Sequence, residues 1–180
     1  MRILLALVSL LVLSPFLYTA EPIKSGPQVG AKVPGPFEPF NINGANADEE
    51  CCLYCKFGND PVVMIFARDM SEPLTVLLKK VDALNAKYKK QDLGTCAIFV
   101  EKATGLRPAL KVVATKAELK NLIIGTLDAP PKGYDIHNDA DVTVMFYVGS
   151  TVKANHAFRK GEFNEKVIDE VLKDVSKIVK

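Results

Sequence analysis

Four continuous apolar runs constrain the fold of this 180-residue chain more than any other feature of its sequence. They lie at residues 61–67, 95–100, 121–127 and 142–148. A continuous apolar run, unlike an alternating one, indicates a strand that is covered on both faces. We therefore expect these four runs to form the central strands of one sheet.

Helical periodicity separates and follows these runs. Ser71 is suited to cap a helix that starts at Glu72, and apolar residues then recur every three or four positions as far as Tyr88. Residues 106–119 predict a second, weaker helix. Residues 162–180 predict a last helix with glutamates first and lysines last, which is the order that the helix dipole favours.

Turn signals complete the predicted topology. The Gly-Ser pair at 149–150 joins the run 142–148 to a further strand at 151–158, which indicates a two-residue hairpin. Residues 21–44 are rich in proline and glycine, and we expect an arm that leads into a short strand or hairpin and ends at the Asn-Gly turn of 43–44. The order of strand, helix, strand, helix, strand, hairpin and helix predicts an α/β sandwich with a mixed sheet.

The first twenty residues predict export. A short positive start precedes an apolar stretch at residues 3–17, and small residues lead up to Ala20. This pattern predicts a signal peptide at 1–20 and a periplasmic or secreted protein without stable membrane association, although an uncleaved anchor helix is the alternative. The remainder suits one domain, which we divide into the arm at 21–44 and a domain at 45–180.

The charge balance excludes one class of partner. The chain has 23 basic and 21 acidic side chains, and the two kinds interleave along it. A nucleic-acid-binding domain needs a concentrated basic surface, so we expect no nucleic acid partner.

Three of the four cysteines lie within five residues, at Cys51, Cys52 and Cys55. Clustered thiols in an exported protein indicate disulfide, redox or metal chemistry. The spacing of Cys52 and Cys55 lets a tight turn close a small disulfide ring that leaves one sulfur available for exchange. Cys51 is a third thiol, which can pair with Cys55 instead or reshuffle a disulfide made by the other two.

Three hypotheses compete for this cluster. In the first, Cys52 is a redox nucleophile, by analogy with other CxxC motifs, Cys55 resolves, and the partners are protein thiols or disulfides. In the second, two of the three cysteines form a structural disulfide in a non-catalytic binding module, and the third is buried or pairs with Cys96. In the third, Cys51, Cys52 and Cys55 bind Cu(I), with His137 as a further candidate ligand, because clustered thiolates select soft metals. We expect no other cofactor.

The remaining cysteine and both histidines favour structural roles. Cys96 lies inside an apolar run, where free cysteine is usually a small buried hydrophobe. His137 lies in a polar loop before residue 142 and is expected to be solvated, with a role as ligand or base as the alternative. His156 alternates with apolar residues in a predicted strand, which favours a half-buried structural histidine.

Several segments resemble one known family. The Val-Gly pair at 29–30, residues 34–37, the Asn-Gly turn and residues 58–66 resemble the opening of the peroxiredoxin-like branch of the thioredoxin superfamily, the alkyl hydroperoxide reductase and thiol-specific antioxidant proteins. Residues 134–136 and 141–146 resemble the thioredoxin sequence around its cis-proline. The resemblance implies a thioredoxin-like three-layer sandwich, in which helices flank a mixed central sheet and a β-hairpin plus helix ends the chain.

The sequence departs from that family where the chemistry takes place. Members carry the reactive cysteine after the central strand, at the start of the next helix, but residues 68–75 contain no cysteine. Val142 also stands before Thr143, where the family has proline. The usual peroxidatic cysteine is therefore missing, and we do not expect a peroxidase. Proximity of the CxxC motif to the helix start at Ser71 would favour redox chemistry, whereas a location at the far end of the sheet would favour a structural disulfide.

Overall fold

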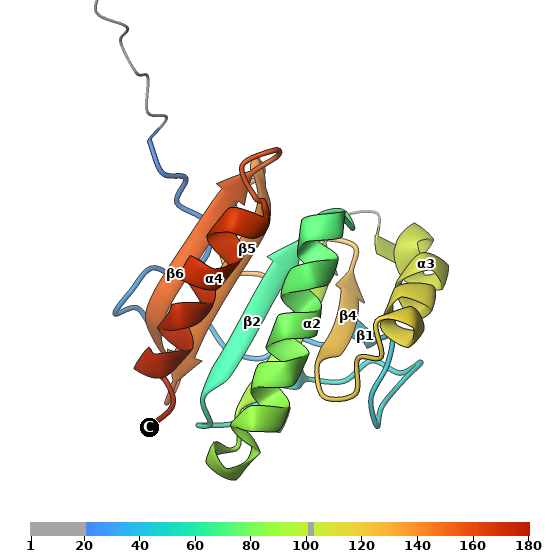
Figure 1. Ribbon diagram of the computed structural model, residues 1–180, viewed down its shortest axis with the longest axis horizontal. Coiled ribbons are helices and arrows are strands. Elements are labelled where there is room, and N and C mark those ends of the chain that lie inside the picture. Colours follow the sequence, from blue (N-terminus) through green and yellow to red (C-terminus); the bar gives the residue numbers. More distant parts are fainter. Residues whose placement is uncertain (1–20, 101–102) are drawn as a thin grey trace, which may run out of the picture.

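A mixed sheet of six strands forms the centre of the molecule in a computed structural model, which describes residues 21–100 and 103–180 (Figure 1). The predicted signal peptide lies outside the described residues. The order across the sheet is β1-β4-β3-β2-β5-β6. The strands are β1 (Phe40–Asn41), β2 (Val62–Ala67), β3 (Gly94–Val100), β4 (Ile123–Leu127), β5 (Ala140–Val148) and β6 (Thr151–Arg159).

The four apolar runs are confirmed as the four central strands. β2 pairs in parallel with β3, β3 pairs in parallel with β4, and β2 pairs antiparallel with β5. Every residue of β2 and β3 is buried, as continuous apolar runs require. The predicted hairpin joins β5 to β6, and Gly149 and Ser150 at its turn have φ values of 56° and 57°. Positive φ at both turn residues matches the right-handed twist of the two strands.

Three helices cover one face of the sheet: α2 (Glu72–Lys87), α3 (Ala103–Lys116) and α4 (Glu165–Lys173). Figure 1 shows α2 and α4 in front of the strands. The crossovers from β2 to β3 and from β3 to β4 step in the same direction across the sheet, so their right-handedness places α2 and α3 on the same face. As predicted, Ser71 caps α2, and its Oγ accepts the N–H of Leu74 at 3.3 Å.

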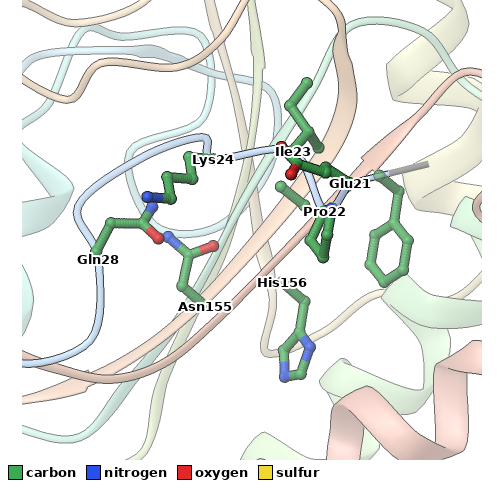
Figure 2. A pocket seen from close by; sticks show the side chains of 9 residues that line it. Glu21, Pro22, Ile23, Lys24, Gln28, Asn155 and His156 are labelled. Atoms are coloured by element: carbon green, nitrogen blue, oxygen red, sulfur yellow. The ribbon is translucent and has the colours of Figure 1, made fainter. Parts of the chain in front are cut away.

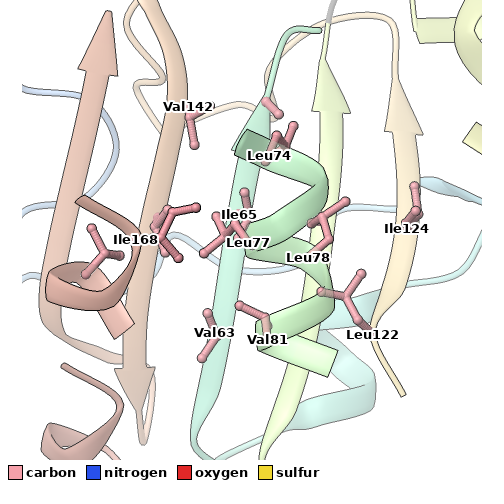
Figure 3. Packing of buried hydrophobic residues seen from close by; sticks show 14 of the residues in the cluster. Val63, Ile65, Leu74, Leu77, Leu78, Val81, Leu122, Ile124, Val142 and Ile168 are labelled. Carbon is pink, nitrogen blue, oxygen red and sulfur yellow. The ribbon is translucent and has the colours of Figure 1, made fainter. Parts of the chain in front are cut away.

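The core beneath these helices accounts for the three- and four-residue spacing of apolar residues in α2. Leu74, Leu77, Leu78 and Val81 of α2 are fully buried, and they pack against β2 and its neighbours (Figure 3). Their spacing of three and four residues places them on one side of the helix. Amphipathic helices that cover an apolar sheet produce the α/β sandwich that the sequence predicted.

The last helix begins later than residue 162. The side chain of Asn164 accepts the N–H of Lys166 at 3.0 Å and caps α4, so the helix starts at Glu165. Glu162 instead accepts the N–H of Arg159 at 2.7 Å in the preceding turn. After Lys173 the chain continues as the 3-10 helix η2 (Asp174–Lys177), and a similar turn, η1 (Lys89–Gln91), follows α2.

The opposite face is covered by the arm, by the short helix α1 (Leu53–Phe57) and by the loop before β5. The arm is an integral part of the domain, because its last segment forms β1 and pairs antiparallel with β4. The residues of these three segments that are buried against this face are Val33, Phe37, Leu53, Phe57, Tyr134 and Ile136. Helix α1 was not predicted, since five residues are too few for periodicity to be read.

None of the helices within residues 21–100 and 103–180 has the length and apolar character that a bilayer span requires.

Candidate functional site

The CxxC motif forms a disulfide. Cys52 and Cys55 are bonded to each other, with 5.3 Å between their Cα atoms, while Cys51 is a free, half-buried thiol. The backbone N–H of Cys55 also points at Cys52, whose Sγ accepts it at 3.0 Å. The structure therefore selects the pairing of Cys52 with Cys55 over that of Cys51 with Cys55.

Helix α1 holds this disulfide against the sheet. Leu53 is fully buried and Phe57 nearly so, and both belong to the core of the second face. The hydroxyl of Tyr54 lies 3.0 Å from Ser150 Oγ in the turn between β5 and β6. These contacts leave Cys52 half-buried and Cys55 exposed.

The segment before α1 is also fixed in place. The N–H of Cys51 donates to the carbonyl of Pro39 at 3.2 Å, and the chain around Glu50 forms a bridge with Phe40. Because Phe40 belongs to β1, the cysteine cluster is attached to the edge of the sheet on one side and to α1 on the other. The positions of the sulfurs thus follow from backbone contacts as well as from packing.

The sheet separates the disulfide from the start of α2. Leu53 lies in the core of one face, whereas Leu74 at the start of α2 lies in the core of the other. Phe57 packs against Gly94, the first residue of β3, so α1 runs toward the ends at which the parallel strands begin. Helix α2 starts beyond Ala67, where β2 ends. Its N-terminus does not stabilise a thiolate of Cys52 or Cys55, and this placement is the one that favours a structural disulfide.

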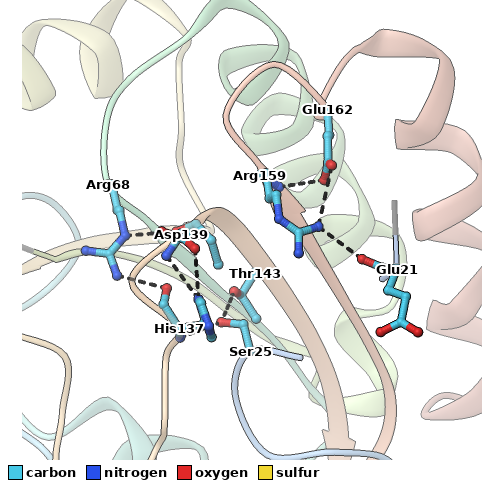
Figure 4. Close-up of polar contacts among 9 residues, drawn as sticks. Glu21, Ser25, Arg68, His137, Asp139, Thr143, Arg159 and Glu162 are labelled. Atoms are coloured by element: carbon cyan, nitrogen blue, oxygen red, sulfur yellow. Dashed lines mark hydrogen bonds and ion pairs between the residues drawn. The ribbon is translucent and has the colours of Figure 1, made fainter. Parts of the chain in front are cut away.

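Charged and polar groups occupy the corner at which α2 begins. The Arg68 guanidinium donates to the carbonyls of Ala140 and His137 at 2.9 and 3.0 Å (Figure 4). A cavity of about 440 Å³ lies beside it, lined by Arg68, Asp69, Asn138, Asp139, Asp141, Arg159 and Lys160. Burial raises the pKa of Asp141. Cysteine is absent from this lining, which agrees with the missing peroxidatic residue.

The arm completes this corner from the second face. Ser25 Oγ lies 2.7 Å from Thr143 Oγ1 and accepts the N–H of His137 at 3.1 Å (Figure 4). Thr143 is the residue before which the family that the sequence resembles carries proline. In this chain a serine of the arm, more than a hundred residues away in sequence, satisfies the polar groups there.

His137 does not join the cysteines. Its ring is exposed, and its Nδ1 accepts the N–H of Asp139 at 3.1 Å. Within the described part of the chain, no group of three or more His, Cys, Asp or Glu residues is arranged to hold a metal ion. The backbone carbonyl of His137 accepts from Arg68, which places His137 in the corner at which α2 begins. The ligand set of Cys51, Cys52, Cys55 and His137 stays a prediction from the sequence.

Cys96 and His156 behave as predicted. Cys96 is fully buried in β3 without a disulfide partner, so it does not pair with Cys51, and burial raises the pKa of its thiol. His156 is partly buried, and its Nε2 lies 2.8 Å from Asp174 Oδ2. It also borders a cavity of about 670 Å³ between β6 and residues 21–24 of the arm (Figure 2). The lining of this cavity contains no cysteine.

Sequence reasoning missed the residues that anchor the disulfide. Leu53 and Phe57 are spaced four apart, which is the pattern of one helical turn with a buried side, but the segment is too short for that signal to stand out. The contact between Tyr54 and Ser150 spans 96 residues and has no local signal.

No family model and no curated protein sequence matches the chain, but many solved structures do. Peroxidoxin BcpB from Mycobacterium tuberculosis is 13% identical with a TM-score of 0.61, over 86% of this chain and 99% of that one. A secreted M. tuberculosis disulfide oxidoreductase homologous to E. coli DsbE is 14% identical with a TM-score of 0.56, over 78% and 95% of the two chains. A thiol peroxidase from Chromobacterium violaceum is 13% identical with a TM-score of 0.55, over 86% and 91%.

The protein has the thioredoxin fold. The predicted three-layer sandwich with a mixed sheet and a C-terminal hairpin plus helix is confirmed. Structural matches at identities this low show the fold alone. The activity depends on the particular residues of this chain. Among those residues, Cys52 and Cys55 form a disulfide that lies outside the corner at which α2 begins.

Proposed function

We propose that this protein is an exported thiol-disulfide exchange protein that acts on protein thiols or disulfides through Cys52 and Cys55. The observation that carries the proposal is the disulfide itself, closed at CxxC spacing with Cys55 exposed to solvent. A thiolate attacks a disulfide only where it can reach a sulfur, and the exposure of Cys55 provides that access.

Two further features support the proposal. The predicted signal peptide directs the chain to a compartment in which disulfides form and exchange. The hydrogen bond from the Cys55 N–H to Cys52 Sγ stabilises negative charge on that sulfur, which is the charge that appears when the disulfide opens. Peroxide reduction is not part of the proposal, because residues 68–75 carry no cysteine.

The test is dithiol oxidation by the purified, disulfide-containing protein. A model peptide with two cysteines is incubated with it, and loss of peptide thiols and gain of protein thiols are measured together. We expect a stoichiometric two-electron exchange. The Cys52→Ser and Cys55→Ser variants should each lose it, while Cys51→Ser reports whether the third thiol participates. An oxidised protein that leaves the peptide thiols intact, or a Cys52→Ser variant with full activity, would contradict the proposal.

A structural disulfide in a non-catalytic module is the second candidate, and the position of α1 across the sheet from α2 favours it. The two candidates differ in redox equilibrium. A structural disulfide stays closed in glutathione buffers that open an exchanging one. Equilibration of the protein across a series of dithiothreitol and glutathione ratios, followed by alkylation of free thiols, separates them.

Copper binding by Cys51, Cys52, Cys55 and His137 stays a prediction from the sequence. Once the disulfide is reduced, Cys51, Cys52 and Cys55 offer three thiolates of the kind that Cu(I) prefers. Titration of the reduced protein with Cu(I) in the presence of a competing chelator tests this, and substitution of Cys51 and Cys55 by serine should abolish any complex that these thiolates form.

A further inference from the structure

The two sulfurs of the disulfide are not equivalent, and their difference assigns them distinct roles. We propose that Cys55 is the sulfur that bonds to the substrate and that Cys52 is the sulfur that leaves and later resolves. This assignment rests on the proposed exchange function and reverses the roles that the CxxC spacing alone suggested.

The burial of α1 sets this difference. Leu53 and Phe57 are the first and last residues of the helix, and both are buried against the sheet. At 100° per residue, Cys55 lies about 200° around the helix axis from each of them, on the opposite side. Its side chain therefore belongs to the solvent face of α1, and Cys55 is exposed.

Cys52 has a different environment. It precedes the helix, next to Cys51, whose backbone is hydrogen-bonded to Pro39 at the edge of the sheet. Cys52 is half-buried. Because attack on a disulfide requires an approach to one particular sulfur, access favours Cys55.

The hydrogen bonding favours the same direction of cleavage. The Cys55 N–H donates to Cys52 Sγ at 3.0 Å, so the charge of a departing Cys52 thiolate meets a donor that is already in place. A better-stabilised leaving thiolate departs faster. Access at Cys55 and the hydrogen bond at Cys52 thus both select cleavage with Cys52 as the leaving group.

Exchange proceeds through one mixed disulfide between Cys55 and the substrate. A substrate thiolate attacks Cys55 Sγ, a bond forms between the substrate sulfur and Cys55, and the Cys52–Cys55 bond breaks with its electron pair on Cys52. A second substrate thiolate then attacks the substrate sulfur of this mixed disulfide and releases the Cys55 thiolate. The substrate gains a disulfide and loses two electrons and two protons. The protein gains two electrons, and its two thiolates take up protons from solvent.

The reverse reaction uses the same bonds. The Cys55 thiolate of the reduced protein attacks one sulfur of a substrate disulfide and forms the same mixed disulfide, while the substrate S–S bond breaks with its electron pair on the other substrate sulfur. Cys52 then attacks Cys55 Sγ, closes the protein disulfide and releases the reduced substrate. Cys55 is the substrate-bonding residue in both directions.

Two single-thiol variants of the pair test the assignment against oxidised glutathione. Cys51→Ser/Cys52→Ser retains Cys55, and Cys51→Ser/Cys55→Ser retains Cys52, so the third thiol is absent from both. Mixed-disulfide formation is followed by intact mass. We expect the variant with Cys55 to react at least about tenfold faster. Equal rates, or a faster reaction of the variant with Cys52, would overturn the assignment.

The unmodified protein provides a second measurement that does not depend on how the variants fold. Its disulfide is opened with limiting reduced glutathione, quenched in acid and cleaved with chymotrypsin after Leu53 or Tyr54, which separates Cys52 from Cys55. We expect glutathione on the peptide that contains Cys55, and its presence on Cys52 instead would refute the assignment. A Cys51→Ser protein with the intact pair that does not exchange with the dithiol peptide would refute the proposed function itself. Exchange by that protein together with glutathione on Cys52 would refute only the roles.

Discussion

The ring of Phe57 lies directly against Gly94, and a Cβ added at Gly94 would come within 2.5 Å of Phe57 Cδ1. Gly94 is the first residue of β3, and Phe57 is the last residue of α1. The absence of a side chain at Gly94 therefore decides how closely α1 approaches the sheet. Since α1 carries Cys55, this contact also sets where the disulfide lies.

Gly94→Ala should displace Phe57 and loosen α1. The added methyl group overlaps three ring carbons of Phe57, so we expect a destabilisation of about 1–3 kcal/mol, measured by urea unfolding. Gly105→Ala is the matched control. Gly105 lies in α3, and a Cβ there meets nothing within 4 Å. The higher helix propensity of alanine should therefore increase the free energy of unfolding by at most about 1 kcal/mol. An unchanged stability of Gly94→Ala would show that Phe57 relaxes without cost.

Leu53→Ala should destabilise the protein more than Gly94→Ala, because it removes a fully buried side chain from the start of α1. We expect a loss of about 2–5 kcal/mol in the free energy of unfolding. Lys56→Ala, an exposed position on the same helix, should change it by less than about 0.5 kcal/mol. Similar values for the two variants would contradict the anchoring of α1 by Leu53.

Ser25→Ala tests the attachment of the arm. The hydroxyl of Ser25 contacts Thr143 Oγ1 and accepts the N–H of His137, so removal of this hydroxyl leaves both groups unpaired. The expected cost is about 1–3 kcal/mol in urea unfolding. Proteolysis near the N-terminus of the folded protein should also become faster, because the arm is held less firmly. Ser176→Ala, which removes an exposed hydroxyl of η2, is the control and should have little effect.

Asp174 should make stability depend on pH in the acid range. Burial raises the pKa of Asp174, but hydrogen bonds from Lys177 and His156 outweigh burial, so the pKa in the folded protein lies below its ordinary value. A lowered pKa stabilises the fold above the unfolded-state value of about 4, and this contribution is lost as the pH falls through the folded-state value. Asp174→Asn should therefore cost about 1 kcal/mol at pH 6, and the difference from the parent protein should shrink below about pH 4.

Chemical unfolding of both proteins between pH 3 and pH 6 checks this expectation. Asp169→Asn serves as the comparison, because it removes an exposed partner of Lys80 and should change stability by less than about 1 kcal/mol at pH 6. If the difference in unfolding free energy between Asp174→Asn and the parent protein grew toward pH 3, it would contradict a lowered pKa of Asp174 in the folded protein.

The sequence by itself determined the layered α/β architecture of this protein. The continuous apolar runs identified the buried strands, the cap at Ser71 placed α2, and the Gly-Ser pair placed the hairpin. These features are local, because burial on both faces, helix periodicity and turn conformation each follow from neighbouring residues. The absence of a cysteine from the corner at which α2 begins could be predicted for the same reason, since residues 68–75 directly follow the central strand.

Only the tertiary structure decided what the cysteines face. The pairing of Cys52 with Cys55, the exposure of Cys55 and the separation of both from α2 depend on α1, a five-residue helix that has no stability of its own. Contacts of Phe57 with Gly94 and of Tyr54 with Ser150 hold it, and these partners are far apart in sequence. The position of the site is therefore set by long-range packing, which sequence periodicity does not encode.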